Sequence, residues 1–310
     1  MTHRSMLLAV LLAVAPFPGM AREQGTRPAS MDELAIQSHG ARLNGFVYRA
    51  AGSGTHPTVL FLHGYPGNER NLDLAQAVRR AGYNALYIDY RGNWGSGGTF
   101  SPANALDDVA SVLAWARDPA NAAKYAIDPQ RLSLVGHSFG GWLALITASR
   151  DPALRCVSAM AAWNLGWAAG RFPTHPDEAK ELHDSLAWTA EAGGPTHLDA
   201  DAVMEAMAAN AHDWNYLSHA PALKDRPLLL VAATRDTPDE GVALHAQLAQ
   251  AIRLAGGKRV ATIVYDDDHP FSSNRLLLAN ALVDWLRKEN CQGSAKADDA
   301  NVGTARTPTK

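Results

Sequence analysis

The most distinctive chemistry of the sequence lies in a Gly-x-Ser-x-Gly pentapeptide that spans residues 136–140 and is centred on Ser138. The residues before it, 132–135, form an apolar run typical of a buried strand, and residues 142–148 after it are typical of a helix. A sharp turn from strand to helix presents the central hydroxyl at the edge of a sheet, and the flanking glycines leave room for strained backbone. We therefore predict that Ser138 is a nucleophile; the alternative is an ordinary glycine-rich turn with an incidental serine.

A serine nucleophile needs a base that takes its proton and an acid that orients the base. Asp236 follows the apolar run 228–233, and His269 comes shortly after the last such run, 260–265. The chain order Ser138, Asp236, His269 is the order that accompanies nucleophiles on strand-to-helix turns of this kind. The sequence therefore predicts a catalytic triad of these three residues.

Other carboxylates compete for these roles. Asp239 lies three residues after Asp236, and Asp266–Asp268 directly precede His269. A triad acid is expected in the loop just after its strand, which favours Asp236. We expect the three acids before His269 to form a solvated turn, with the alternative that Asp268 raises the basicity of the histidine.

Two backbone N–H groups are candidates for the oxyanion hole. Phe139 follows the nucleophile at a helix N-terminus, where its N–H can meet developing negative charge. Tyr65 follows the strand-like run 57–62, and Gly64 before it lets the backbone approach a substrate closely. We predict Tyr65 and Phe139 as the donors. The Tyr65 ring is expected to stack on substrate or to form a wall of the site.

Other polar residues near these segments are expected to have structural roles. His63 is interpreted as a loop residue rather than a second base, and His137 as a packed residue of the turn. The glycine-rich stretch 90–101 does not precede a helix as a dinucleotide motif requires, so we expect a flexible loop at the rim of the site. Ser96 within it lacks a comparable turn. The histidines of a later segment lack tight metal-ligand spacing: His175, His183, His197, His212 and His219.

Strand-like and helix-like patterns alternate along most of the chain, which predicts a mainly parallel sheet with helices on both faces. The expected strands lie at 34–37, 43–48, 57–62, 85–88, 132–135, 157–162, 228–233 and 260–265. The expected helices lie at 69–81, 104–116, 142–148, 240–254 and 273–289.

The alternation stops between residues 163 and 221. This segment is too long for a simple connection and contains helix-like stretches at 177–190 and 199–211, so we interpret it as a helical insertion over the carboxyl edge of the sheet. Its tryptophans are expected either to line an apolar cleft or to form the core of the insertion: Trp163, Trp167, Trp188 and Trp214.

The 310 residues suit one large α/β domain or two small ones, and 47% hydrophobic residues provide for a sizeable core. A net charge of −3 gives no basic face, so a nucleic-acid partner is not expected.

Residues 1–21 resemble a signal peptide, the alternatives being an uncleaved anchor or a misassigned start. We expect a polar leader at 22–30, one hydrolytic domain at 31–290 and a disordered tail at 291–310. We expect the protein to be exported to the periplasm or secreted from the cell, without membrane attachment once the signal peptide is cleaved.

The two cysteines, Cys156 and Cys291, have no metal-type spacing. In a parallel sheet, a strand start and a helix end fall on the same edge, which would bring them together. The sequence leaves open a disulfide in an exported protein and two free thiols.

Several motifs together resemble the α/β-hydrolase superfamily. They are the segments 60–64 (Leu-Phe-Leu-His-Gly), 89–92 (Asp-Tyr-Arg-Gly) and 136–141 (Gly-His-Ser-Phe-Gly-Gly), with Asp236 and the pair 268–269 (Asp-His). The closest likeness is to the branch that holds dienelactone-hydrolase-like and prolyl-oligopeptidase-like enzymes.

This resemblance covers about residues 31–290 and implies an α/β-hydrolase fold, a mostly parallel eight-stranded sheet with helices on both faces, and a Ser-Asp-His triad. The sequence departs from both relatives. Nothing in it could form the β-propeller that such peptidases carry, and dienelactone hydrolases use cysteine where this chain has Ser138. The substrate of neither relative is carried over.

We therefore expect a serine hydrolase that forms an acyl-enzyme, with carboxylic esters of small-molecule acyl groups as substrates and with no metal or organic cofactor. One alternative is a serine peptidase or amidase of the prolyl-oligopeptidase-like type. Another is a non-catalytic binding protein with the same fold.

Overall fold

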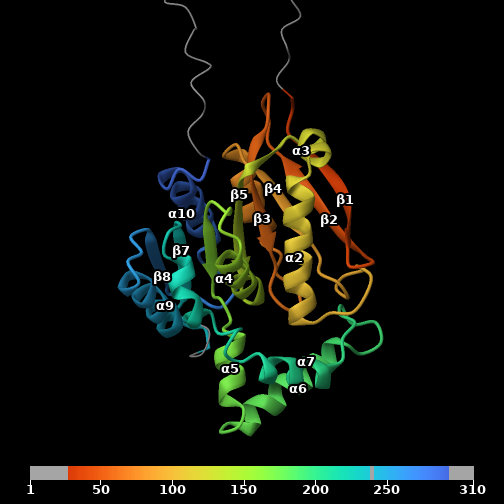
Figure 1. Ribbon diagram of the computed structural model, residues 1–310, viewed down its shortest axis with the longest axis vertical. Coiled ribbons are helices and arrows are strands. Elements are labelled where there is room, and N and C mark those ends of the chain that lie inside the picture. The colour runs from red at the N-terminus through yellow and green to blue at the C-terminus, as the bar shows by residue number, and fades with distance from the viewer. Residues whose placement is uncertain (1–26, 238–240, 293–310) are drawn as a thin grey trace, which may run out of the picture.

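The computed structural model describes residues 27–237 and 241–292, which form one eight-stranded sheet with helices on both faces (Figure 1). The strand order is β1-β2-β4-β3-β5-β6-β7-β8. The pairs β1/β2 and β2/β4 are antiparallel, and all others are parallel. The strands are β1 (Ser30–Ser38), β2 (Ala41–Arg49), β3 (His56–Leu62), β4 (Asn84–Ile88), β5 (Ile127–His137), β6 (Val157–Met160), β7 (Leu228–Ala233) and β8 (Val260–Tyr265).

Helices cover the sheet on two sides and enclose two cores. One core lies under α2, α4 and α9 and contains Val109, Leu145 and Leu248; the other lies under α1 and α10 and contains Val78 and Leu282. The helices are α1 (Leu72–Arg80), α2 (Pro102–Arg117), α3 (Pro119–Tyr125), α4 (Phe139–Arg150), α5 (Leu165–Arg171), α6 (Pro176–Thr189), α7 (Ala200–Ala209), the 3₁₀ helix η1 (Tyr216–His219), α8 (Ala220–Leu223), α9 (Val242–Leu254) and α10 (Arg275–Lys288).

Burial explains why the strand patterns differ. The strands β4, β6 and β7 are buried along their whole length, as expected of mostly apolar strands in a sheet covered on both faces. In the edge strand β1, Leu34 and Ile36 are buried while Glu33, Ala35 and Gln37 are exposed, which is the alternation of a strand with one solvated face. The sequence prediction of an α/β-hydrolase fold is confirmed by this sheet.

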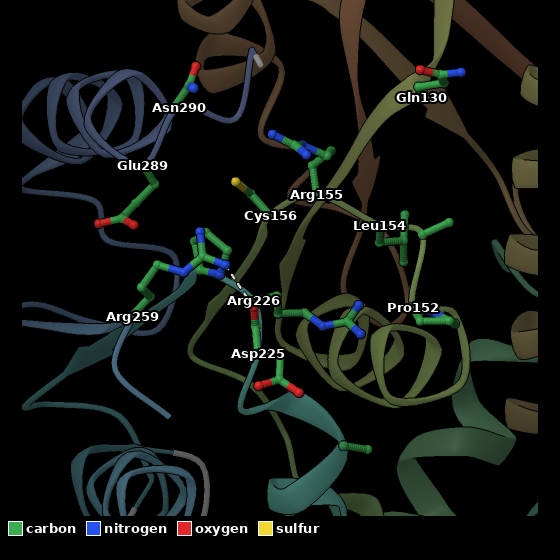
Figure 2. Close-up of a pocket in the computed structure, with 13 residues that line it drawn as sticks. Gln130, Pro152, Leu154, Arg155, Cys156, Asp225, Arg226, Arg259, Glu289 and Asn290 are labelled. Atoms are coloured by element: carbon green, nitrogen blue, oxygen red, sulfur yellow. Dashed lines mark hydrogen bonds between the residues drawn. The ribbon is translucent and has the colours of Figure 1, made fainter. Parts of the chain in front are cut away.

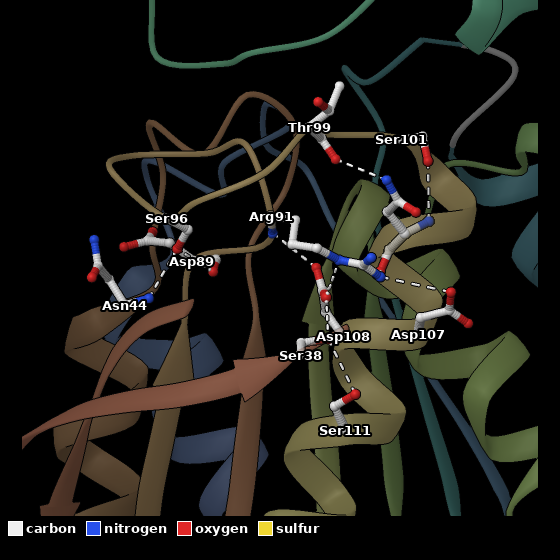
Figure 3. A network of polar contacts seen from close by, with 11 residues as sticks. Ser38, Asn44, Asp89, Arg91, Ser96, Thr99, Ser101, Asp107, Asp108 and Ser111 are labelled. Atoms are coloured by element: carbon white, nitrogen blue, oxygen red, sulfur yellow. Dashed lines mark hydrogen bonds and ion pairs between the residues drawn. The ribbon is translucent and has the colours of Figure 1, made fainter. Parts of the chain in front are cut away.

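A buried ion pair joins β1, α2 and the loop that follows β4 (Figure 3). Asp108 of α2 is fully buried and accepts hydrogen bonds from the Arg91 backbone N–H at 2.8 Å and from Arg91 Nε at 2.6 Å. The Ser38 hydroxyl donates to the same carboxylate at 2.6 Å. Because each buried charge is paired and hydrogen-bonded, the network fixes the start of the loop after β4.

The segment from α5 to α8 interrupts the alternation of strands and helices, and α5, α6 and α7 lie beyond the carboxyl ends of the strands (Figure 1). Trp214 attaches this segment to the domain, because its carbonyl accepts a hydrogen bond from Trp142 Nε1 at 2.7 Å and it is itself buried. Trp188 is 67% exposed, whereas Trp163 and Trp167 are partly buried against the core. The four tryptophans therefore form neither a common cleft nor a common core.

The ends of the folded domain differ slightly from expectation. The first strand begins at Ser30, within the expected leader, and Arg27 pairs with Gly52 in an isolated bridge. Cys291 is buried, and the carbonyl of Gln292 accepts a hydrogen bond from Arg131, so the fold extends beyond residue 290. The expected signal peptide and residues 293–310 of the expected tail lie outside the described residues.

Cys156 and Cys291 form a disulfide across 135 residues, with their Cα atoms 5.8 Å apart. The pair joins the start of β6 to the end of α10 at the amino edge of the sheet. This outcome decides between the two alternatives that the sequence leaves open. Within the described part of the chain, the helices are too short or too polar to cross a membrane.

Candidate active site

Ser138 lies on the turn between β5 and α4 with φ 57° and ψ −123°, a backbone conformation that few non-glycine residues adopt. The flanking glycines are required by packing. A Cβ at Gly136 would lie 2.0 Å from the Gly140 carbonyl oxygen, and a Cβ at Gly140 would lie 2.0 Å from the Leu62 carbonyl oxygen. The strained turn is therefore held by close contact of β5, α4 and β3, as the motif predicts.

The imidazole of His269 is held by Asp236. His269 Nδ1 lies 2.9 Å and 2.8 Å from the two carboxylate oxygens of Asp236, whose side chain is only 2% exposed. The contact assigns the proton to Nδ1, and Nε2 is then the nitrogen that takes up a proton. Both residues follow parallel strands, β7 and β8, at the sheet edge that also carries Ser138. The competing Asp239 lies outside the described residues.

The acids before His269 do not form the solvated turn that we expected. Asp267 is fully buried and accepts hydrogen bonds from the backbone N–H groups of Ser273 and Asp268 and from the side chain of Asn274. Burial acts to raise the pKa of Asp267, but these hydrogen bonds outweigh it and lower the pKa to about 2. The prediction failed because a run of three identical acids gives no sign that one of them organises the loop before α10.

The other two acids face different partners. Asp266 is exposed and pairs with Arg235 at 2.7 Å. Asp268 accepts a hydrogen bond from the Ser272 N–H at 2.7 Å. The contact places the Asp268 carboxylate toward the turn that leads into α10.

The loop after β3 lies directly against the nucleophile. A Cβ at Gly64 would lie 3.0 Å from Ser138 Cβ and 3.5 Å from Ser138 Oγ, so a larger residue here would have to displace Ser138 or the loop by a few tenths of an ångström. Tyr65 follows Gly64 in this loop. On the other side, Phe139 begins α4, where its N–H has no acceptor within the helix. Phe139 is thus adjacent to Ser138 in the chain, and the loop that carries Tyr65 approaches Ser138 at Gly64.

Two buried histidines support these loops. His137 Nε2 donates to the His269 carbonyl at 2.9 Å, and His63 Nδ1 donates to the Gly64 carbonyl at 2.7 Å. Burial lowers the pKa of His137 to about 3 and that of His63 to about 4, so both are neutral at physiological pH. They hold the backbone of the base and of the oxyanion loop, as expected of structural residues.

The glycine-rich loop 90–101 is not the free loop that we expected. The Gly92 carbonyl accepts from His197 N–H at 2.7 Å, and Phe100 N–H donates to the His197 carbonyl at 2.7 Å. Trp94 N–H donates to the Pro195 carbonyl at 2.9 Å. The loop therefore pairs with the insertion, which a sequence reading misses because the partners lie about a hundred residues apart. Ser96 is buried and donates to the Asp89 carbonyl at 2.8 Å, which is a structural role.

Sequence reasoning also missed two threonines. Thr189 and Thr196 of the insertion are both buried, and their hydroxyls contact the Tyr65 hydroxyl. No spacing or motif marks them, because their partner lies in a distant segment. Among residues 27–237 and 241–292, no group of three His, Cys, Asp or Glu side chains comes together in a way that could hold a metal ion.

A separate cavity of about 480 Å³ opens at the amino edge of the sheet, beside Cys156 and three arginines, Arg155, Arg226 and Arg259 (Figure 2). It lies at the strand starts, whereas Ser138, Asp236 and His269 lie at the strand ends. The cavity is therefore no part of the candidate active site.

The sheet order, the strained serine turn and the Asp236–His269 pair at one sheet edge define an α/β hydrolase. More narrowly, residues 39–265 match the X-Pro dipeptidyl-peptidase (S15) family, and the chain belongs to that family.

The fold is shared with esterases of low sequence identity. The esterase Pf2001 of Pyrococcus furiosus has a TM-score of 0.63 at 18% identity, covering 84% of this chain and 91% of that chain. A putative dienelactone hydrolase from Klebsiella pneumoniae has a TM-score of 0.58 at 16% identity, covering 84% of this chain and 100% of that chain.

Curated relatives match shorter stretches. Cutinase 2 of Thermobifida cellulosilytica is 28% identical over 159 residues, which are 49% of this chain and 58% of that protein. The quorum-quenching protein AidA of Acinetobacter baumannii is 28% identical over 153 residues, 48% of this chain and 50% of that protein. An uncharacterized 31.7 kDa protein of Escherichia coli is 33% identical over 114 residues, 35% of this chain and 38% of that protein. The matches thus span between about two fifths and three fifths of these relatives' lengths.

Proposed function

We propose that the protein is a serine hydrolase that cleaves carboxylic esters through an acyl-enzyme, with Ser138 as nucleophile, His269 as base and Asp236 as orienting acid. The observation that carries this proposal is the bidentate contact of Asp236 with His269 Nδ1 at 2.8–2.9 Å, at the sheet edge where the strained turn holds Ser138. A carboxylate in this position holds the histidine tautomer and stabilises the imidazolium.

The reaction proceeds in two halves. Ser138 Oγ attacks the acyl carbon, its proton passes to His269 Nε2, and the backbone N–H groups of Tyr65 and Phe139 stabilise the oxyanion. Collapse of this intermediate breaks the ester bond, and His269 returns the proton to the leaving alkoxide. Water then attacks the acyl-enzyme, with His269 as base again, and releases the carboxylic acid and free Ser138.

Esters are the favoured substrates because the similar proteins of named activity include esterases and cutinases. The substrate is a small-molecule acyl ester, and the insertion shapes its pocket. The partly buried Trp163 and Trp167 begin that insertion, beyond the end of β6. Their apolar rings suit an apolar acyl or alcohol group.

The second candidate is a peptidase, which the family match favours because the family is described as X-Pro dipeptidyl-peptidase. The two functions are separated by comparing p-nitrophenyl butyrate with Ala-Pro-p-nitroanilide under the same conditions. Ester turnover without anilide turnover removes the peptidase, whereas preferential anilide turnover removes the esterase as the main function.

Labelling with a fluorophosphonate tests the nucleophile. One equivalent of label is expected on the folded protein, because an activated serine reacts with this electrophile and an ordinary hydroxyl does not. Ser138→Ala is expected to abolish both labelling and ester turnover. Ser185→Ala, which changes an exposed serine of α6, is the matched control and keeps both. Absence of label on the folded protein supports a non-catalytic binding protein instead.

We further propose that residues 1–21 are a signal peptide and that the hydrolytic domain begins at about residue 30, extends to about residue 292 and contains the insertion at about 163–221. The disulfide between Cys156 and Cys291 supports export, since disulfides persist in oxidising compartments such as the periplasm. Mass spectrometry of the protein recovered from the periplasm tests this: cleavage after Ala21 is expected, and an intact N-terminus on a cytosolic protein contradicts it.

A further inference from the structure

The side chain of Tyr65 reaches away from the nucleophile and into the insertion. Its hydroxyl contacts Thr189 Oγ1 and lies 3.4 Å from Thr196 Oγ1. Thr189 ends α6 and is 2% exposed, and Thr196 is 1% exposed in the segment after it. Three hydroxyls thus meet at a place where both threonines are shielded from solvent, which favours hydrogen bonds among them.

Nearby backbone carbonyls accept hydrogen bonds from the two threonine hydroxyls, and this indicates the direction of the hydrogen bond to Tyr65. Thr189 Oγ1 donates its single proton to the Leu186 carbonyl at 2.8 Å, and Thr196 Oγ1 donates to the Thr189 carbonyl at 3.0 Å. With these two carbonyls as acceptors, Thr189 Oγ1 is left to accept from the Tyr65 hydroxyl. In this arrangement the phenol proton points toward the insertion.

The segment that carries Thr196 is itself held at the backbone. The neighbours of Thr196, Pro195 and His197, are hydrogen-bonded to the loop 90–101 at 2.7–2.9 Å. The same loop contains Phe100, which is buried, and the centroid of its ring lies 5.1 Å from the centroid of the Tyr65 ring. The Tyr65 side chain is therefore held at its hydroxyl by the two threonines and at its ring by Phe100.

The other end of Tyr65 is the backbone N–H that our proposed function places in the oxyanion hole. Gly64 before it lies in contact with Ser138. Any movement of the Tyr65 side chain is transmitted to this short loop, and an oxyanion donor acts only when it is within hydrogen-bond distance of the developing charge.

We propose that Thr189 and Thr196 are positioning residues for the oxyanion hole: they hold the Tyr65 phenol and thereby fix the Tyr65 backbone N–H beside Ser138. The inference rests on the proposed function. Through these hydroxyls the insertion takes part in transition-state stabilisation without touching the substrate.

The test uses the full-length protein with Thr189→Val, which removes the accepting hydroxyl at nearly constant volume, and Thr189→Ser, which restores it. Thr189→Val is expected to lower kcat on p-nitrophenyl butyrate about ten-fold, since a small misplacement of a catalytic group has effects of this order. KM is expected to change less than about two-fold, because the lost interaction acts in the transition state. Affinity for an alkyl trifluoromethyl ketone, which binds as an oxyanion adduct, is expected to fall in parallel with kcat.

Two further comparisons separate positioning from general damage. Tyr65→Phe is expected to resemble Thr189→Val, and the double variant is expected to be no worse than either single one, because both remove the same hydrogen bond. Thr174→Val changes an exposed threonine of the insertion that bonds only to neighbouring residues, and it keeps full activity.

Several outcomes overturn the inference. Unchanged kcat and ketone affinity in Thr189→Val exclude a positioning role. If Tyr65→Phe lowers kcat while Thr189→Val does not, the phenol itself donates to the oxyanion. If Thr189→Ser does not restore kcat, the effect of the valine is one of packing. If wild type neither turns over ester nor takes the fluorophosphonate label, the proposed function fails, and this inference fails with it.

Discussion

Asp89 carries a carboxyl at the end of β4 that is only 9% exposed. Burial raises the pKa of Asp89 to about 6, although Arg70 at 3.8 Å and the Tyr87 hydroxyl at 3.2 Å favour the charged form. In the unfolded chain the same group has a pKa of 3.8. The folded state therefore binds a proton more tightly, and the stability that this proton provides is lost as pH rises from about 4 to about 6.

This linkage predicts that Asp89→Asn stabilises the protein at neutral pH. The amide cannot ionise, so the variant avoids the cost of a buried charge, which we expect to be roughly 2 kcal/mol above pH 7. Urea unfolding at pH 8 should show the gain, and the gain should disappear near pH 4.

Asp284→Asn provides the control, because Asp284 lies on the exposed side of α10. It should not change the unfolding free energy at either pH. A stability difference in Asp89→Asn that is the same at pH 4 and pH 8 would contradict a cause in ionisation.

The residues of the proposed triad have clearer sequence signals than the residues that support the loops around them. Ser138, Asp236 and His269 each follow a strand with a recognisable pattern, and parallel strands bring their carboxyl ends to one edge. Thr189 and Thr196 contact Tyr65, more than a hundred residues away, and no local pattern relates the two segments. Asp267 bonds within its own loop, but a run of three acids does not mark which of them is buried. The roles of the two threonines depend on how distant segments pack together, and the spacing of residues along one sequence does not show this.

At the junction of β5 and α4, the elements approach more closely than any side chain allows. Gly140 lies against the backbone of Leu62 in β3. Gly140→Ala is therefore expected to push α4 off the sheet, to destabilise the fold by roughly 1–3 kcal/mol, and to lower ester turnover because Ser138 moves with the helix.

Gly170→Ala is the matched helical control. A Cβ at Gly170 of α5 meets no atom within 4 Å, and alanine has the higher helix propensity. Thermal unfolding and p-nitrophenyl butyrate turnover of both variants check this pair. If Gly140→Ala and wild type had equal unfolding free energies, α4 would be able to shift away from the sheet without destabilising the fold, which would contradict the prediction.

Strands made mostly of apolar residues were predicted correctly, and short helices were not. The buried strand β7 is a continuous apolar run, and the four-residue strand β6 is apolar except for Ser158. The helices α3 and α5 were missed, since each has only seven residues, too few for a clear apolar periodicity. The strand β5 begins at Ile127 rather than Leu132, and the prediction started late because residues 128–131 are polar or proline.

Across the whole molecule, the disulfide is the longest covalent constraint. Closing a loop of 135 residues restricts the unfolded chain, so Cys156→Ala with Cys291→Ala is expected to lower the unfolding free energy by roughly 2–5 kcal/mol. Ester turnover at 25 °C should be retained, because the pair lies at the sheet edge opposite Ser138.

Urea unfolding of wild type with and without reductant, beside the double variant, measures this contribution. Reduced wild type and the double variant should unfold at similar urea concentrations. Loss of activity at unchanged stability would mean that the disulfide acts on the site and not on the unfolded chain.

Topology followed from the sequence because strands that alternate with helices admit few arrangements. The conformation of the insertion did not follow, since its helices pack on residues of the domain as well as on one another. Trp214 against Trp142 is one such contact, and the pairing of Pro195 and His197 with the loop 90–101 is another.

The hydrogen bonds between the loop 90–101 and residues 195–197 have a consequence for the design of chimeric proteins. The insertion and the loop 90–101 share a few backbone hydrogen bonds, so their conformations depend on each other although about a hundred residues separate them. A chimera that takes only the insertion from a relative would break these hydrogen bonds. Grafts that change substrate preference should therefore exchange both segments together.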